Sequence, residues 1–380
     1  MRIALVSTGC GRIVRGFEAH TESLYLALRR IRPDIRVTLF QGARSRDEGR
    51  AYVPNFHRHD APAWWLGEMR ANHLEKRSFA AALYPALRAG GYDIVHYNEL
   101  TMGSALHHLR RTLGGSFRLL YCNGAPSPPA HYHHRCDYAQ LLNGPMWDEA
   151  IGFGLEAERL FLLPYGVDAN QFSDGHVRRS ELRRQWGVPD DAVLVLSVAA
   201  VKREHKRIDY LLRELGALGQ EVWLVVAGQR TGDTAELESL AEKVMPGRWR
   251  FLSVTPDRVA EIYGAADLFV HTALSEGLGR VLIEAMFAGL PLIVHDGPVF
   301  RWVAQDYGAR FIDMSAPGAL AAAVDAHIRR GAAAVNRAAA WKRFSWESIL
   351  PAYEAMYGKI SGAPRPASGL ASKRAAAVTV

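Results

Sequence analysis

The sequence predicts an α/β protein with two Rossmann-like, doubly wound domains that face each other across a cleft. Short apolar runs alternate with helical patterns from residue 2 onward, as in βαβ units. The alternation restarts near residue 192, after an apolar run that Pro164 and Gly166 interrupt. The length of 380 residues fits two domains of ordinary size.

The first domain is predicted to span residues 1–168. A helical pattern near residues 19–30 follows the first apolar run. The predicted strands are residues 2–7, 37–41, 92–97, 117–122 and 159–168. Because ligands of such sheets bind at the carboxyl ends of strands, the polar residues that follow these runs are candidates for a site.

The second domain is predicted to span residues 169–345. Its strand-like runs are residues 192–198, 222–228, 251–254, 268–271, 290–294 and 310–314. Residues 346–360 form an amphipathic terminal helix that we expect to pack back on the first domain. Residues 361–380 are rich in Ala and Ser and hold few large apolar side chains, so a disordered tail is expected.

The composition is that of a globular protein, with 49% hydrophobic and 22% charged residues. No apolar run reaches the ~20 residues that span a bilayer. Residues 2–7 read as a strand and not as a signal peptide. Three scattered cysteines do not make a disulfide framework, which favours a cytoplasmic location.

The net charge of +7 is unevenly distributed. Residues 1–165 hold 20 Lys and Arg against 15 Asp and Glu, which leaves +2 for the remainder. A basic first domain fits peripheral contact with an anionic inner membrane or an acidic acceptor, and it fits plain solubility equally well. A nucleic-acid partner is not expected.

The segment Glu276-Gly-Leu-Gly-Arg-Val-Leu-Ile-Glu284 is the most informative part of the sequence. A glycine turn that opens a helix near Gly279 would expose N–H groups that attract phosphate. The two carboxylates, about two helical turns apart, could bind hydroxyl groups on either side of that phosphate. The pattern suits a sugar nucleotide, although a buried helix with a glycine cap explains it about as well.

A basic segment, Lys202-Arg-Glu-His-Lys-Arg207, follows the first strand of the second domain. Cations there could neutralise a leaving nucleoside diphosphate. Lys206 is the preferred candidate, because the buried helix expected from Ile208 would fix its position. The alternative is a solvated charge run at a helix start.

Further motifs occur in a fixed order with these two segments. They include Gly16-Phe-Glu18, Asp93-Ile-Val-His96, Leu163-Pro-Tyr-Gly-Val-Asp168 and Ala288-Gly-Leu-Pro291. With this series the chain resembles a retaining glycosyltransferase of the GT-B fold, glycosyltransferase family four (glycosyl transferases group 1). The resemblance covers roughly residues 1–360 and is strongest from 192 to 296.

The resemblance implies transfer of a sugar from a UDP- or GDP-sugar to a glycan, lipid-linked or small-molecule hydroxyl acceptor. It implies no cofactor and no divalent metal, because cations and a helix start would carry the charge of the leaving group. Glu276 would bind the donor sugar, Glu284 the ribose and Lys206 the diphosphate. The implied donor-binding residues are Gly16, Lys202, Arg203, Lys206, Gly228, Gly277, Leu278, Gly279, Arg280, Val281 and Glu284.

One departure from the family concerns a site histidine. Members commonly carry His-Gly after the strand that corresponds to residues 117–122, whereas this chain has Asn123-Gly124. Asparagine donates and accepts hydrogen bonds but holds no positive charge. Asn123 is therefore expected at the catalytic face, beside Glu276 and Lys206. The alternative is that His96, His131, His133 or His134 takes the role of the family histidine.

Acceptor contacts are expected in the first domain, at His96, His131, His133 and Trp64. The run His131-Tyr-His-His-Arg-Cys136 lacks a second ligand cluster at zinc-like spacing, so no metal site is predicted. A plain loop explains the histidines equally well, and helix core explains the tryptophan.

Two alternative functions stay open. The first is a sugar-nucleotide epimerase of the GT-B fold. The second is a catalytically silent nucleotide-sugar-binding protein, which Asn123 in place of histidine would suggest. A dinucleotide-dependent dehydrogenase is disfavoured, because Gly9, Gly11 and Gly16 do not have the Gly-x-Gly-x-x-Gly spacing.

Overall fold

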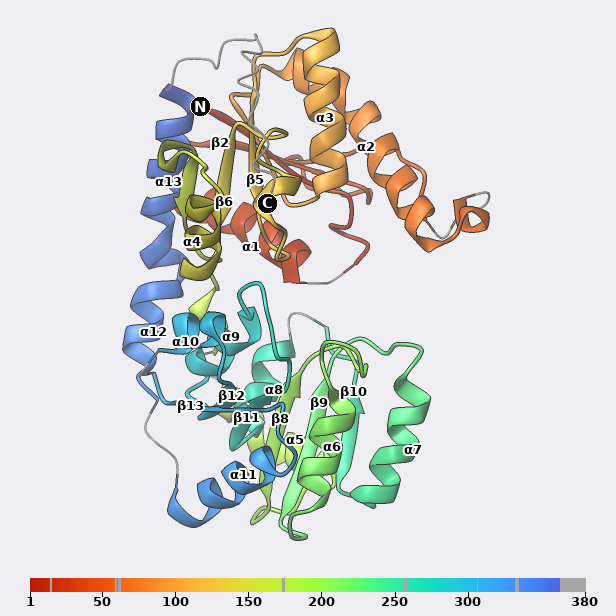
Figure 1. Ribbon diagram of the computed structural model, residues 1–380, viewed down its shortest axis with the longest axis vertical. Helices are drawn as coiled ribbons and strands as arrows, with labels where there is room; N and C mark the ends of the chain where they lie inside the picture. The colour runs from red at the N-terminus through yellow and green to blue at the C-terminus, as the bar shows by residue number, and fades with distance from the viewer. Residues whose placement is uncertain are drawn as a thin grey trace, which may run out of the picture.

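The chain folds into two lobes, each built around one fully parallel sheet (Figure 1). The N-terminal sheet has the order β3-β2-β1-β4-β5-β6-β7, and the C-terminal sheet has the order β10-β9-β8-β11-β12-β13. The predicted fold class is confirmed. The computed structural model describes residues 1–13, 16–58, 60, 63–172, 175–255, 258–305, 307–331 and 335–362, without the side chains of residues 63, 64, 175 and 176.

The N-terminal lobe contains the first seven strands. They are β1 Arg2–Ser7, β2 Arg36–Gln41, β3 Arg50–Tyr52, β4 Ile94–Tyr97, β5 Arg118–Cys122, β6 Tyr138–Leu141 and β7 Leu160–Leu162. Its helices are α1 Gly16–Ile31, α2 Glu68–Gly90, α3 Leu100–Leu113 and α4 Gly144–Gly152. The central strands are apolar along their length because helices cover both faces of a parallel sheet.

The C-terminal lobe repeats this design. Its strands are β8 Val193–Val198, β9 Val222–Ala227, β10 Trp249–Leu252, β11 Leu268–His271, β12 Leu292–His295 and β13 Ala309–Ile312. Its helices are α5 Arg179–Trp186, α6 Ile208–Gly216, α7 Thr234–Val244, α8 Val259–Ala265, α9 Arg280–Phe287, α10 Pro298–Ala304, α11 Ala319–Arg330 and α12 Arg337–Phe344.

The last helix, α13 Trp346–Gly362, returns to the N-terminal lobe and runs along its side (Figure 1). Its apolar stripe shares a core with β1 and α1, in which Leu350 and Tyr353 pack with Leu5 and Leu28. The Trp346 indole N–H donates a hydrogen bond of 2.6 Å to the Ser23 hydroxyl of α1. The tail expected from residue 361 lies outside the described residues from position 363 onward.

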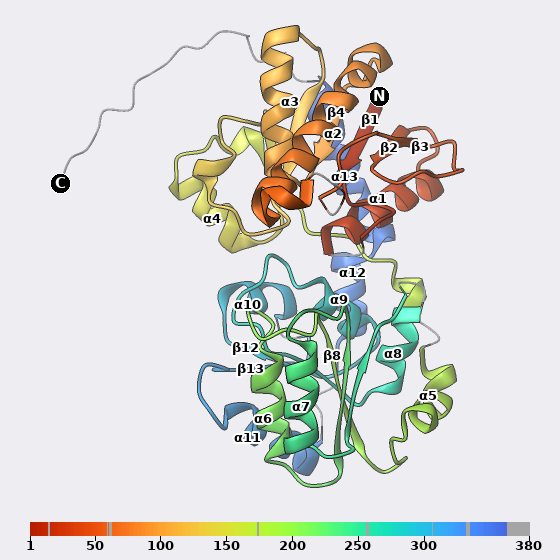
Figure 2. The ribbon, with the colours of Figure 1, turned by 90° about the vertical axis from the view of Figure 1, so that its right-hand side faces the viewer.

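Three loops meet where the lobes face each other. The residues after β5 and β6 of the N-terminal lobe contact the turn between β11 and α9, and α4 contacts α10 (Figure 2). This junction therefore combines ends of strands from both sheets. None of the described helices has the length and apolar character needed to cross a membrane.

Candidate active site

A glycine turn opens α9 at the junction of the lobes. Gly279 is the N-terminal cap of the helix and adopts a left-handed conformation, with φ of 71° and ψ of 56°. A side chain would be strained there, which explains the glycine. The N–H groups of Leu278 and Gly279 donate no hydrogen bond to any described residue. Two backbone donors are thus left for an external partner at a helix start.

The carboxylate of Glu276 precedes this turn and is held by one oxygen only. The Lys206 ammonium and the His271 ring both bind Oε1, the histidine through Nε2 at 2.8 Å. No described residue hydrogen-bonds Oε2. The side chain is 14% exposed, so one oxygen is fixed and the other remains able to accept a hydrogen bond.

The same contacts determine the charge of Glu276. Burial raises the pKa of its carboxyl group, but the hydrogen bond and charge of His271 and the charge of Lys206 outweigh burial and lower that pKa to about 2. The carboxylate is therefore an anion at any physiological pH. It can accept a hydrogen bond but cannot act as a general acid there.

The basic segment between β8 and α6 places Lys206 beside the turn that precedes α9. His205 and Arg207, on either side of it, both have positive φ, 66° and 51°. His205 Nε2 lies 2.9 Å from the Ser275 carbonyl, and the Thr272 hydroxyl donates to the Lys206 carbonyl at 2.7 Å. These contacts hold the left-handed backbone in place.

The other two cations predicted there differ from Lys206. The Arg203 guanidinium pairs with Glu236 of α7 at 3.0 Å, so it is directed away from the turn. Lys202 is half-buried on the same segment. Of the three predicted cations, Lys206 is thus the one whose contact with the turn the structure describes.

Glu284 lies on α9, one helical turn after Arg280. Its side chain is nearly buried; Oε2 accepts a hydrogen bond of 2.8 Å from Tyr263, and Oε1 lies 3.0 Å from Arg280 Nε. Arg280 Nη1 is buried with no hydrogen-bond partner among the described residues. The pair therefore offers an unsatisfied donor beside a carboxylate.

Arg280 also lines a cavity of about 690 Å³ between α1 and the C-terminal lobe. Its walls include Glu18 and Ser23 of the N-terminal lobe and Trp346 of α13. The volume matches the range of small-molecule sites.

Gly277 lies against the N-terminal lobe. A Cβ atom at this position would come within 2.7 Å of the Gly124 carbonyl oxygen and 3.3 Å of Pro126. The close neighbour of this glycine is therefore the loop after β5, and the predicted contact of Gly277 with the donor stays a prediction. Gly228 is similar, since a Cβ there would lie 2.0 Å from the Ala199 carbonyl oxygen.

Asn123 holds that loop together. Its Oδ1 accepts from the Ser127 N–H at 3.2 Å and from the Tyr121 hydroxyl at 3.3 Å, while its Nδ2 donates to the Ser127 carbonyl at 3.1 Å. The side chain is buried, and both of its polar atoms are engaged. Asn123 thus shapes the loop that faces Gly277, and its predicted place at the catalytic face stays a prediction.

The predicted acceptor residues are not brought together. His96 is buried on β4, where Nδ1 lies 2.8 Å from the Tyr357 hydroxyl of α13, and burial lowers the pKa of its ring to about 3. It therefore belongs to the core, and the prediction that it contacts an acceptor is wrong. His131 is exposed, and the side chain of Trp64 lies outside the described residues.

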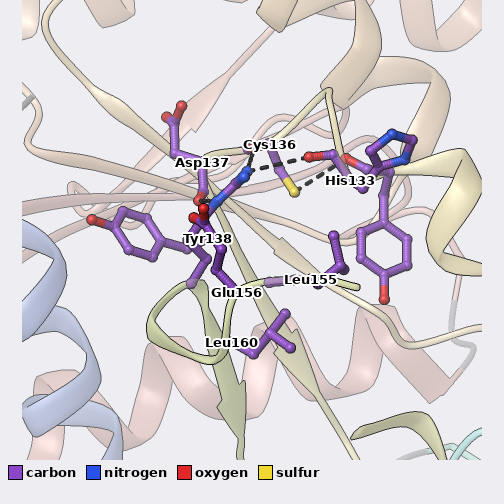
Figure 3. A pocket seen from close by; sticks show the side chains of 10 residues that line it. His133, Cys136, Asp137, Tyr138, Leu155, Glu156 and Leu160 are labelled. Atoms are coloured by element: carbon purple, nitrogen blue, oxygen red, sulfur yellow. Dashed lines mark hydrogen bonds between the residues drawn. The ribbon is translucent and has the colours of Figure 1, made fainter. Parts of the chain in front are cut away.

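His133 lines a different and much smaller space, with Cys136, Asp137 and Leu160 (Figure 3). Its volume of about 10 Å³ holds no more than a water molecule. Gly16, predicted to lie near phosphate, is the exposed first residue of α1 and has open space beside it. Among the described residues, no three His, Cys, Asp or Glu side chains are grouped to hold a metal.

Two residues of the site were not singled out from the sequence. His271 ends β11 and fixes Glu276, and a polar residue at the end of a buried strand was the available signal. Asn143 caps α4 and donates to the Gly277 carbonyl at 2.5 Å. Its helix-cap pattern, Asn before Gly-Pro, was readable, but its contact across the lobes was not.

Comparison with known proteins finds one matching family and several relatives. Residues 178–343 match the family Glycosyl transferases group 1. D-inositol 3-phosphate glycosyltransferase of Xylanimonas cellulosilytica is 32% identical over 222 residues, which cover 54% of this chain and 53% of that protein. Mannosylfructose-phosphate synthase of Agrobacterium fabrum is 29% identical over 196 residues, 48% of this chain and 42% of that one.

Solved structures resemble the whole fold. Anabaena HepE in complex with UDP and glucose has a TM-score of 0.74 and 18% identity, covering 94% of this chain and 99% of HepE. Sucrose-phosphate synthase of Thermosynechococcus elongatus has a TM-score of 0.77 and 19% identity, covering 94% and 98%.

The chain spans about half the length of the curated relatives it matches. The family match covers the lobe that holds Lys206, Glu276 and Glu284, and the solved structures extend the likeness to both lobes. Together these findings show a two-lobed fold of the GT-B type, in which residues 178–343 are similar to the family Glycosyl transferases group 1.

Proposed function

We propose that the protein is a retaining glycosyltransferase that moves a sugar from a nucleoside diphosphate sugar to a hydroxyl acceptor. The observation that carries the proposal is the arrangement at the start of α9. Glu276 has one oxygen fixed by Lys206 and His271 and one oxygen able to accept a hydrogen bond, next to the two unpaired N–H groups of Leu278 and Gly279. A sugar hydroxyl and a diphosphate fit these groups.

Each group has a role in the transfer. The bond between the sugar C1 and the β-phosphate oxygen breaks, and the Gly279 N–H with Lys206 stabilises the leaving diphosphate, while the Leu278 N–H contacts the sugar. A bond forms between C1 and the acceptor oxygen on the same face, and the acceptor proton passes to the departing phosphate oxygen. Glu276 holds the sugar through a hydroxyl group. No divalent metal is needed, since a cation and fixed dipoles already face the charge that develops.

The nucleotide is proposed to contact Arg280, Val281 and Glu284. Glu284 would accept hydrogen bonds from the ribose, and Arg280 would turn its unpaired Nη1 toward a phosphate. UDP is favoured over GDP as the first nucleotide to test, because HepE, with the same fold, was solved with UDP and with UDP-glucose. Lys202 is proposed as a second cation beside Lys206.

The N-terminal lobe, residues 1–168, is proposed to bind the acceptor, and residues 169–345 the donor. A surface near the start of α2 could present a lipid-linked acceptor at the cytoplasmic face of a membrane. Trp65 and Met69 are exposed there, Trp65 to 72%, next to Arg70, while the exposed Phe56 lies farther along α2, where its N–H bonds Ser78 beside Arg77. Apolar side chains flanked by arginines suit an anionic headgroup region. Co-sedimentation with anionic but not neutral vesicles tests this contact.

The proposed function is tested by binding and by turnover. Thermal unfolding is measured with UDP and GDP, because a ligand of the native state raises the unfolding temperature. Release of the nucleoside diphosphate from UDP-glucose is then followed with hydroxyl acceptors, in the presence of EDTA. Acceptor-dependent release with retained anomeric configuration supports the proposal.

Three results would instead overturn the proposed function. Failure of both nucleotides to bind removes the donor site. Binding without any release makes the chain a silent nucleotide-sugar-binding protein. Acceptor-independent inversion at the sugar C2 makes it an epimerase.

A further inference from the structure

One asparagine joins the two lobes at the donor turn. Asn143 is fully buried at the start of α4 in the N-terminal lobe. Its Oδ1 accepts a hydrogen bond of 2.8 Å from the Met146 N–H, which caps the helix. Its Nδ2 donates a hydrogen bond of 2.5 Å to the carbonyl of Gly277, a residue 134 positions away in the chain. A single side-chain amide thus caps α4 and also bonds the Gly277 carbonyl of the other lobe.

The surroundings hold Asn143 in this position. The next residue, Gly144, lies against Trp302 of α10, where a Cβ atom would be 2.9 Å from the indole. The Gly124 carbonyl approaches Gly277 from the same lobe. In Figure 2, α4 lies directly above α10. The contact between Asn143 and Gly277 is therefore part of a packed interface between the lobes.

The bond to the Gly277 carbonyl has a consequence for the next N–H group. The carbonyl of Gly277 and the N–H of Leu278 belong to one planar, trans peptide unit and point in opposite directions. Fixing the carbonyl toward the N-terminal lobe therefore fixes the Leu278 N–H away from it. That N–H group has no acceptor among the described residues and lies two residues after Glu276.

We propose that Asn143 is a positioning residue, which orients the Leu278 N–H for the donor by clamping the Gly277 peptide from the opposite lobe. The inference rests on the proposed function, since it assumes that the turn binds a sugar nucleotide. It adds a residue of the N-terminal lobe to a proposed donor site whose other residues lie in the C-terminal lobe.

The test separates the two tasks of the amide. In Asn143→Asp the Oδ1 that caps α4 is kept, but the NH₂ group is replaced by an oxygen that repels the Gly277 carbonyl. Asn143→Ala removes both tasks. Asn336, which caps α12 by accepting from the Ala339 N–H at 3.1 Å, supplies the matched control Asn336→Asp.

Each variant is compared with the wild-type protein by UDP calorimetry, thermal unfolding and steady-state turnover of UDP-glucose. For Asn143→Asp we expect at least a tenfold fall in kcat per folded molecule, UDP affinity changed by less than threefold, and a lower unfolding temperature, because a buried carboxylate then faces the Gly277 carbonyl. The reason is that the clamp acts on the sugar side of the turn, whereas Glu284 and Arg280 bind the nucleotide. Asn143→Ala lowers the unfolding temperature as well.

Turnover of Asn143→Asp equal to that of Asn336→Asp would overturn the inference. So would a loss of kcat that merely follows the loss of folded protein or of UDP affinity. Failure of the wild-type chain to bind UDP or GDP is a different result, because it removes the proposed function itself before Asn143 is tested.

Discussion

Replacing Glu276 by glutamine removes a charge that two neighbours stabilise, and the effect on the stability of the protein can be worked out. The pKa of this carboxyl falls from 4.5 to about 2 on folding. One unit of pKa is worth about 1.4 kcal/mol, so the ionised form stabilises the fold by about 3 kcal/mol. Since the group is mostly buried, solvent screening reduces this value little. Glu276→Gln should therefore lower the free energy of unfolding by about 3 kcal/mol at pH 7.

The pH dependence gives a sharper test. Because the pKa is lower in the folded state, the stabilisation is present above pH 4.5 and is lost as the pH falls toward 2. Linkage predicts that wild type loses about 1 kcal/mol of this contribution by pH 4 and about 2 kcal/mol by pH 3. The glutamine variant lacks this loss, so the gap between the two proteins narrows as the solution becomes more acidic.

Urea unfolding at pH 7, 5 and 4 measures that gap, with Glu158→Gln as an exposed control. A gap that is the same at all three pH values would refute the reasoning. So would a glutamine variant as stable as wild type at pH 7, because Lys206 and His271 would then gain nothing from the carboxylate.

Three further predictions concern ligands and turnover. Glu284→Ala should weaken UDP binding about 10- to 100-fold in calorimetry, since ribose hydroxyls lose a charged acceptor, and unchanged affinity would place the ribose elsewhere. Gly277→Ala should cut kcat at least tenfold because its Cβ would meet the Gly124 carbonyl at 2.7 Å; wild-type turnover would show that the lobes separate freely at this point. Asn123→Ala should lower kcat by a larger factor than it lowers the fraction of folded protein, since it frees the Ser127 loop, and an equal loss of both would contradict a role in the site.

The sequence predicts those parts of the site that are encoded locally. Gly279 and the two acids of the turn lie within nine residues, so helix spacing and glycine conformation suffice to place them. The central strands can be predicted equally well from the sequence, because a strand buried on both faces is a continuous apolar run. β6, with Gln140 in a four-residue strand, does not show that pattern and was not predicted.

Other assignments depend on contacts that no local pattern reveals. Lys206 and Arg203 are both basic residues of one loop, and only the positive φ values on either side of Lys206 decide which of them faces the turn. Histidine is a common site residue, but His96 is covered by α13, a helix whose Tyr357 lies 261 residues later in the sequence. A side chain at Gly277 would meet the Gly124 carbonyl of the other lobe, and this contact cannot be read from the sequence around Gly277.

The nucleotide part and the sugar part of the proposed donor site draw on different lobes. The nucleotide half, Arg280 and Glu284 with Tyr263, lies wholly within the C-terminal lobe. The sugar half depends on the peptide after Gly277, which Asn143 holds from the other lobe. Separation of the lobes would break the second arrangement and spare the first. Nucleotide affinity should thus belong to one lobe, whereas sugar transfer should require both, and the acceptor lobe itself completes the orientation of the donor.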